Sequence, residues 1–185
     1  MRKVTRTEDS GLLGLLALFP EDRLIPPDME VVPGESVPEP YRKLLVHHDH
    51  MTLTLEERYG VPVHLRVLDR RLLGNDYARS LVLTVEPGNR VVLLGRMRFQ
   101  LEYCQTGVRK KIIEEGAPLG RILIEHDVLR SIEPELYLRV PLSAELRELF
   151  QVGEEHHSTY GRMALIVCHN APAVELLEIV RPEPT

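Results

Sequence analysis

The chain has 185 residues, of which 43% are hydrophobic and 28% charged, and this composition excludes a coiled coil, a collagen-like chain or a wholly disordered protein. Its formal net charge of −5 argues against a dedicated nucleic-acid-binding protein, which would carry a basic surface. The length predicts one domain that spans residues 1–185.

The N-terminal segment, residues 1–40, predicts a helix followed by a proline-rich connector. The apolar run at 12–19 is far too short to cross a membrane. Glu8 and Asp9 precede it, which does not suit a secretory signal peptide. Residues 20–40 hold six of the fourteen prolines, so we expect an extended surface connector without regular structure.

Beyond residue 40, short helical segments are followed by alternating apolar and polar residues in pairs joined by turns. Helices are predicted at 41–46, 52–59, 105–115 and 143–150, with a further short element at 118–125. Strands are predicted at 61–67, 78–85, 91–101, 136–140, 163–168 and 173–180. Because the strands come as hairpin pairs and not as βαβ units, the fold class is α+β, an antiparallel sheet with helices on one side.

Turn and cap residues support these boundaries. Gly74-Asn75-Asp76 and Pro87-Gly88-Asn89 predict hairpin turns. We expect Asp49 and Ser143 to cap helices, and Gly60 to end one. A solvated tail is expected from residue 181.

Histidines and cysteines give no metal motif. The cluster at 47–50 and the pair His156 and His157 lack HExxH spacing, so they are expected to be solvated histidines near helix ends. Cys104 and Cys168 lie in apolar strands and are expected to be buried free thiols. This fits a reducing compartment, and we expect a cytoplasmic protein with neither metal nor cofactor.

Two charged residues on apolar strand faces are candidates for chemistry. Arg79 shares a face with Leu81 and Leu83, where it needs an anion. The alternative for Arg79 is a structural ion pair with a neighbouring strand. Glu178 shares a face with Leu176, and alternation alone leaves open whether it is exposed at an edge or buried with a partner.

Several segments, taken in order, resemble the chorismate pyruvate-lyase (4-hydroxybenzoate synthase) family, in its divergent branch. The resemblance covers about residues 40–182. The segments are Tyr41-Arg42-Lys43-Leu44-Leu45, Asp49-His50-Met51-Thr52-Leu53-Thr54-Leu55-Glu56, Tyr77-Ala78-Arg79, Gly95-Arg96, Pro118-Leu119-Gly120-Arg121, Tyr160-Gly161-Arg162 and Glu178. The Asp-x-Met-Thr and Pro-Leu-Gly-Arg segments are the most specific.

The resemblance implies an antiparallel sheet flanked by helices, a fold shared with ligand-sensing domains of bacterial transcription regulators. It implies a lyase that converts chorismate to 4-hydroxybenzoate and pyruvate without metal or organic cofactor. It places substrate-binding residues at Met51, Arg79, Leu119 and Glu178, with Arg79 and Glu178 catalytic.

Physical roles can be given to these residues. Arg79 would hold a carboxylate in bidentate fashion. Met51 and Leu119 would wall a dry slot for the ring. Glu178 would hydrogen-bond the ring hydroxyl, and a second arginine, Arg96 or Arg162, would meet the other carboxylate of chorismate.

Two other functions remain open on this fold. One is a non-catalytic, sensor-like domain that binds a small aromatic carboxylate. The other is an enzyme acting on a related acid with different regiochemistry. The expected partners are the small molecules chorismate and 4-hydroxybenzoate, with no nucleic acid and no membrane, in a monomer or homodimer.

Overall fold

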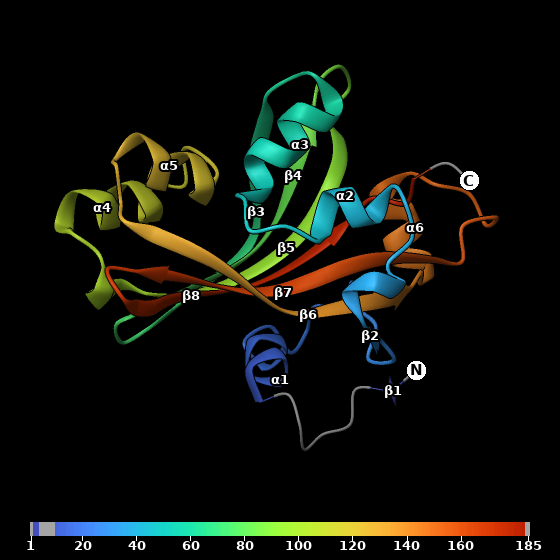
Figure 1. The fold of residues 1–185 in the computed structure, drawn as a ribbon, viewed down its shortest axis with the longest axis horizontal. Helices are drawn as coiled ribbons and strands as arrows, with labels where there is room; N and C mark the ends of the chain where they lie inside the picture. The colour runs from blue at the N-terminus through green and yellow to red at the C-terminus, as the bar shows by residue number, and fades with distance from the viewer. Residues whose placement is uncertain (1, 4–9, 184–185) are drawn as a thin grey trace.

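A computed structural model of the protein describes residues 2–3 and 10–183, and its centre is one eight-stranded antiparallel sheet (Figure 1). The strands lie in the order β1-β2-β6-β7-β8-β5-β4-β3. Their bounds are β1 (Arg2–Lys3), β2 (Glu30–Val32), β3 (Val63–Leu73), β4 (Asp76–Val85), β5 (Arg90–Gln100), β6 (Arg130–Pro141), β7 (Ser158–Cys168) and β8 (Ala171–Val180). Strand β8, late in the sequence, therefore lies between β7 and β5.

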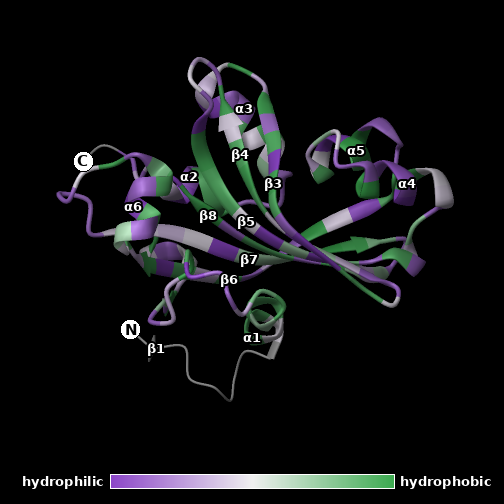
Figure 2. Ribbon diagram, turned by 180° about the vertical axis from the view of Figure 1, so that it is seen from behind, coloured by the Kyte–Doolittle hydropathy of each residue, from purple (hydrophilic) through white to green (hydrophobic). Residues whose placement is uncertain are grey.

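Helices cover both faces of this sheet, so the prediction that they lie on one side is wrong. They are α1 (Ser10–Ala17), α2 (Tyr41–Leu45), α3 (Met51–Tyr59), α4 (Thr106–Glu114), α5 (Leu119–Glu125) and α6 (Ala144–Phe150). One hydrophobic core contains side chains from α2, α3, α4 and α5, and a second contains side chains from α1 and α6. Figure 2 shows the apolar central strands between these layers.

The central strands alternate between the two cores. On β4, Leu81 and Leu83 belong to the first core and Val82 to the second. On β5, Leu93 belongs to the first and Leu94 to the second. Two buried faces explain why these strands are almost continuously apolar in sequence, which reduces the alternation that identifies a one-sided sheet.

The proline-rich connector contains more regular structure than expected. Glu30–Val32 forms strand β2, which pairs with β6, and Gly34–Ser36 forms a 3-10 turn. Proline lacks only its own N–H group, so the three residues of β2, which contain no proline, can pair with β6. Residues 4–9, including Glu8 and Asp9, lie outside the described residues.

Caps and turns are confirmed in part. Gly60 ends α3 with φ of +70°, and the Ser143 side chain accepts from the backbone N–H of Leu146 at 3.2 Å. Asp49 does not cap α3, because His50 occupies the N-cap position and its side chain makes no cap hydrogen bond. Strand β6 begins six residues before the predicted start, and a register shift at Pro134 accounts for the missing alternation.

Cys104 and Cys168 are buried free thiols, as predicted. The expected solvated tail is wrong at its start, because Pro182 and Glu183 are buried. No helix in the described part of the chain combines the length and the apolar character needed to cross a bilayer.

Candidate functional site

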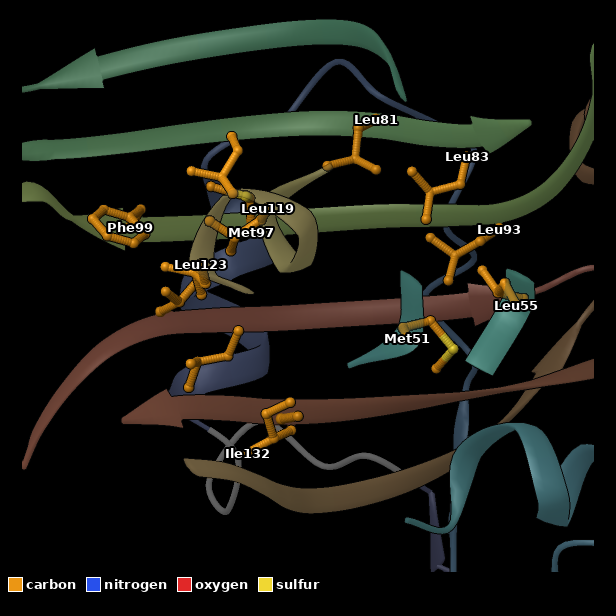
Figure 3. Close-up of a cluster of buried hydrophobic side chains, with 14 of the residues drawn as sticks. Met51, Leu55, Leu81, Leu83, Leu93, Met97, Phe99, Leu119, Leu123 and Ile132 are labelled. Atoms are coloured by element: carbon orange, nitrogen blue, oxygen red, sulfur yellow. The ribbon is translucent and has the colours of Figure 1, made fainter. Parts of the chain in front are cut away.

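A cavity lies between the sheet and α5, and three of the four candidate residues line it. Its volume is about 50 Å³. Arg79, Leu119 and Glu178 line it together with Gly95 and with leucines from β3, β4, β5 and β8. Figure 3 shows Leu119 of α5 over the leucines and methionine of β4 and β5.

The strand register places Arg79 and Glu178 on the same face. Leu81 pairs with Gly95, which pairs with Glu178, so these residues form one row across β4, β5 and β8. Arg79 lies in the next row on this face, opposite Met97. Two strand spacings and a two-residue step put the Cα atoms of Arg79 and Glu178 about 12 Å apart.

Gly95 has no side chain, which leaves space in the cavity between Arg79 and Glu178. A Cβ atom at this position would lie 3.2 Å from side-chain carbons of both Leu81 and Leu93. Such contacts are tight, so a larger residue would fill space between Arg79 and Glu178.

Arg79 is fully buried and its guanidinium is only partly satisfied. Its Nε and Nη1 atoms have no hydrogen-bond partner in the part of the chain that the structure describes. Burial lowers the pKa of Arg79, and the Tyr77 hydroxyl and the Glu115 charge oppose this effect. No carboxylate in the described chain forms an ion pair with Arg79, so the structural alternative of a cross-strand ion pair does not apply here.

A series of interacting side chains contacts the other side of the Arg79 guanidinium. The Tyr77 hydroxyl oxygen accepts a hydrogen bond from Arg79, and Tyr77 donates its hydroxyl proton to Oε1 of Glu115. Glu115 also pairs with Arg70 of β3 at 3.0 Å. Burial and the Glu115 hydrogen bond raise the pKa of Tyr77 to about 12, so this hydroxyl stays protonated.

Glu178 is buried with a partner, which answers the question that alternation left open. Its Oε2 accepts from Nε of Arg162 at 2.7 Å. The remaining nitrogens of Arg162 donate to backbone carbonyls of Leu45, His47 and Asp49 at 3.0 to 3.2 Å. Arg162 therefore connects the cavity wall to the loop between α2 and α3.

The two candidate second arginines are engaged elsewhere. Arg162 is saturated by Glu178 and the loop carbonyls. Arg96 is buried on the opposite side, where it pairs with Asp22 at 2.8 Å and lies over the Phe19 ring. Neither guanidinium is free to meet a second carboxylate in this structure.

Met51 is buried but does not line the cavity. In Figure 3 it lies with Leu55 of α3, apart from Leu119. The helices α3 and α5 nevertheless meet closely, because a Cβ atom on Gly120 would lie 2.9 Å from Oγ1 of Thr52. Met51 belongs to the same hydrophobic core as Leu119 but lies outside the cavity.

The histidine cluster is not simply solvated. His50 is buried, and its Nε2 accepts from Nε of Arg130 at 2.6 Å. Burial and the charge of Arg130 lower the pKa of His50 to about 4. His47 is half-buried, and burial together with Arg162 lowers its pKa. The described residues contain no group of three metal-ligating side chains.

Sequence reasoning did not identify the roles of Tyr77 and Arg162. Both lie in segments that carry the family resemblance, Tyr77-Ala78-Arg79 and Tyr160-Gly161-Arg162. A usable signal for Arg162 is that it shares an apolar strand face with Ala164 and Ile166. Glu178 is 16 residues from Arg162, across the β7–β8 hairpin. The partner of Tyr77 is 38 residues away and the loop carbonyls bound by Arg162 are 113 to 117 residues away, so no local pattern reveals these contacts.

Comparisons with known proteins agree with the fold. No family model and no curated protein matches the sequence. The crystal structure of gene product SA0254 from Staphylococcus aureus aligns with a TM-score of 0.50 and 8% identity, over 74% of this chain and 90% of that one. PhnF from Mycobacterium smegmatis aligns with a TM-score of 0.51 and 10% identity, over 74% of this chain and 65% of that one.

A third structure is the ligand-binding domain of a candidate GntR-family transcriptional regulator from Bordetella bronchiseptica, with a TM-score of 0.47 and 12% identity over 64% and 85% of the two chains. The first two similarities, together with the sheet and its helices, confirm the predicted α+β, chorismate lyase-like fold. The chain spans just under two thirds of the length of PhnF. At these identities the comparisons describe the fold alone.

Proposed function

We propose that this chain binds a small aromatic carboxylate in the cavity between the sheet and α5, with Arg79 holding the carboxylate. The observation that carries the proposal is the pair of unpartnered nitrogens on a fully buried arginine that lines the cavity. A buried guanidinium is costly without an anion, and a carboxylate matches its paired N–H groups.

The cavity walls favour one carboxylate on an apolar ring. Apart from Arg79 and Glu178, the wall side chains are mainly leucines, with Met97, Pro118 and Ile166. Because Arg96 and Arg162 have other partners, Arg79 supplies the one available positive charge among the described residues that line the cavity. A monocarboxylate such as 4-hydroxybenzoate suits this arrangement.

Glu178 sets the orientation of the ligand in the cavity. With Oε2 bound to Arg162, Oε1 is left to accept a hydrogen bond from a ring hydroxyl. Because both side chains project from the same face of the sheet, a ring between them can meet Arg79 with one substituent and Glu178 with another. These are the roles that the family resemblance implies for Arg79 and Glu178.

A second candidate function is the lyase reaction, favoured by the presence of both Arg79 and Glu178 in one cavity. Cleavage of the ether bond of chorismate, with loss of a ring proton, yields 4-hydroxybenzoate and pyruvate. Such an elimination needs a positioned substrate and exclusion of water more than a nucleophile. It would also require room and a partner for a second carboxylate.

Isothermal titration calorimetry tests the binding proposal. Wild-type protein is titrated with 4-hydroxybenzoate and with 4-hydroxybenzyl alcohol, which lacks the carboxylate. We expect saturable binding of the acid only, and no binding by Arg79→Met. Equal binding of the alcohol, or unchanged binding by the variant, would overturn the proposal.

The lyase candidate is tested separately by incubating the protein with chorismate in EDTA. Pyruvate is followed by a coupled assay and aromatic acids by chromatography. Pyruvate and 4-hydroxybenzoate in equal amounts would establish the lyase. Binding of 4-hydroxybenzoate without pyruvate would leave a ligand-binding domain, and pyruvate with another hydroxybenzoate would change the regiochemistry.

A further inference from the structure

A second cavity lies at the far end of β5, and its lining is basic and polar. Its volume is about 380 Å³. It is formed by the end of α3, the start of β5, the segment after β8 and the loop between α6 and β7. Its lining residues are Arg58, Tyr59, Arg90, Val152, His156, Arg181, Pro182 and Glu183.

This cavity is separate from the one at Arg79. The two share no lining residue. Along β5, Arg90 is five residues before Gly95, the floor of the Arg79 cavity, which corresponds to about 17 Å. A ligand in one cavity therefore does not contact a ligand in the other.

Positive charge in the second cavity exceeds the negative charge that is paired with it. Glu183 is committed to Arg58 at 2.5 Å and also accepts from the Tyr59 hydroxyl at 3.3 Å. Neither Arg90 nor Arg181 has a carboxylate partner among the described residues. Three guanidinium groups therefore line this cavity, and Glu183 is the one carboxylate among its described lining residues.

One guanidinium nitrogen of Arg181 lacks a hydrogen-bond acceptor among the described residues. One of its nitrogens, Nη2, donates to the carbonyl of Gln151 at 3.2 Å. Its Nη1 is buried and has no hydrogen-bond partner among the described residues. Burial and the charge of Arg90 lower the pKa of Arg181, while Tyr59 and Glu183 oppose this effect.

Arg90 is held in position while its charge stays exposed. Its guanidinium carbon lies 5.2 Å from the centre of the Tyr59 ring, within the range of a cation–π contact. This contact orients the guanidinium but supplies no anion. The half-buried His156 adds a further polar group to the lining, and it faces the exposed Glu155 at 3.6 Å.

We propose that this second cavity binds a phosphate dianion, free or as a phosphomonoester, between Arg90 and Arg181. Two guanidinium groups balance two negative charges, and each can present two N–H groups to a tetrahedral oxyanion. The polar lining fits phosphate oxygens and offers little apolar wall for an aromatic ring. This site is independent of the function proposed for the Arg79 cavity.

The test measures binding of inorganic phosphate by calorimetry at fixed ionic strength, with chloride replaced by phosphate. The variant is Arg90→Gln, because Arg90 is exposed and its loss leaves the core unchanged. The matched control is Arg66→Gln, another exposed strand arginine that lines neither cavity. We expect saturable binding by wild type and by R66Q, and at least tenfold weaker binding by R90Q.

Two further measurements complete the test. Monomethyl phosphate, compared with inorganic phosphate, distinguishes an ester group from the free ion: tighter binding of the ester indicates a phosphomonoester ligand. Addition of 4-hydroxybenzoate should leave the phosphate affinity unchanged. Absence of saturable phosphate binding, or equal binding by R90Q and R66Q, would overturn the proposal.

Discussion

Replacing Arg79 by methionine should stabilise the free protein while abolishing ligand binding. The Nε and Nη1 atoms of Arg79 are buried without partners, and each unsatisfied buried donor costs about 1–3 kcal/mol. The substitution removes both and keeps an apolar side chain of similar length. It gives up the hydrogen bond that Arg79 donates to the Tyr77 hydroxyl oxygen, and a hydrogen bond from a charged group is worth about 1.5–3 kcal/mol.

The difference between these effects is a gain of about 2 kcal/mol in the free energy of unfolding. For a chain of this length the midpoint of thermal unfolding should rise by about 6 °C. Urea unfolding followed by circular dichroism gives the free energy directly, and an unchanged slope shows that compactness is unchanged.

Arg96→Met is the matched control for this prediction. Arg96 is equally buried but pairs with Asp22 at 2.8 Å, so its removal leaves a carboxylate without its partner and should cost about 3–5 kcal/mol. Opposite signs for the two variants would separate an arginine that awaits a ligand from a structural one. Destabilisation of both by similar amounts would refute the reasoning about Arg79.

Three further results are expected. Glu178→Leu should lower the free energy of unfolding by about 3 kcal/mol, because it leaves the buried Arg162 without its carboxylate partner. It should also speed amide hydrogen exchange in residues 45–50, and unchanged exchange would contradict the link through Arg162. Gly120→Val should cost about 1–3 kcal/mol by pressing α5 against Thr52 and His50, so a wild-type melting temperature would count against this contact. The pKa of His50 is lowered to about 4 in the folded state, so the unfolded chain takes up the proton first as the pH falls. The free energy of unfolding should therefore fall by about 2 kcal/mol between pH 6.5 and 4. His50→Gln should flatten this pH dependence in urea titrations, and an unchanged dependence would exclude His50 as its source.

Local signals predicted the hairpins and the face of Arg79 well. The turns at Gly74 and Gly88 have positive φ values that the sequence motifs require, and once they fix the pairing, alternation places Arg79 beside Leu81 and Leu83. The positions that pattern alone could not settle depend on contacts between distant segments. Whether Glu178 is exposed or buried depended on Arg162, one strand away.

Helix coverage was misjudged for a related reason. The apolar run that forms α1 predicts a helix, but not the side of the sheet on which it packs. Its position follows from Val82 and Leu94, which face away from the Arg79 cavity and need cover. A strand that is apolar on both faces indicates two layers of helix, and this signal was available in residues 81–85 and 91–94.

The sheet order also has a consequence for the order of folding. β8 lies between β7 and β5 but follows both in sequence. Until β8 is synthesised, the early hairpins β3-β4-β5 present β5 as an open, apolar edge, which is the kind of edge that pairs with other chains. Completion of the sheet requires contacts across long sequence separations, which slows folding. A chain truncated before residue 171 should therefore aggregate during refolding, while the full chain refolds slowly but cleanly.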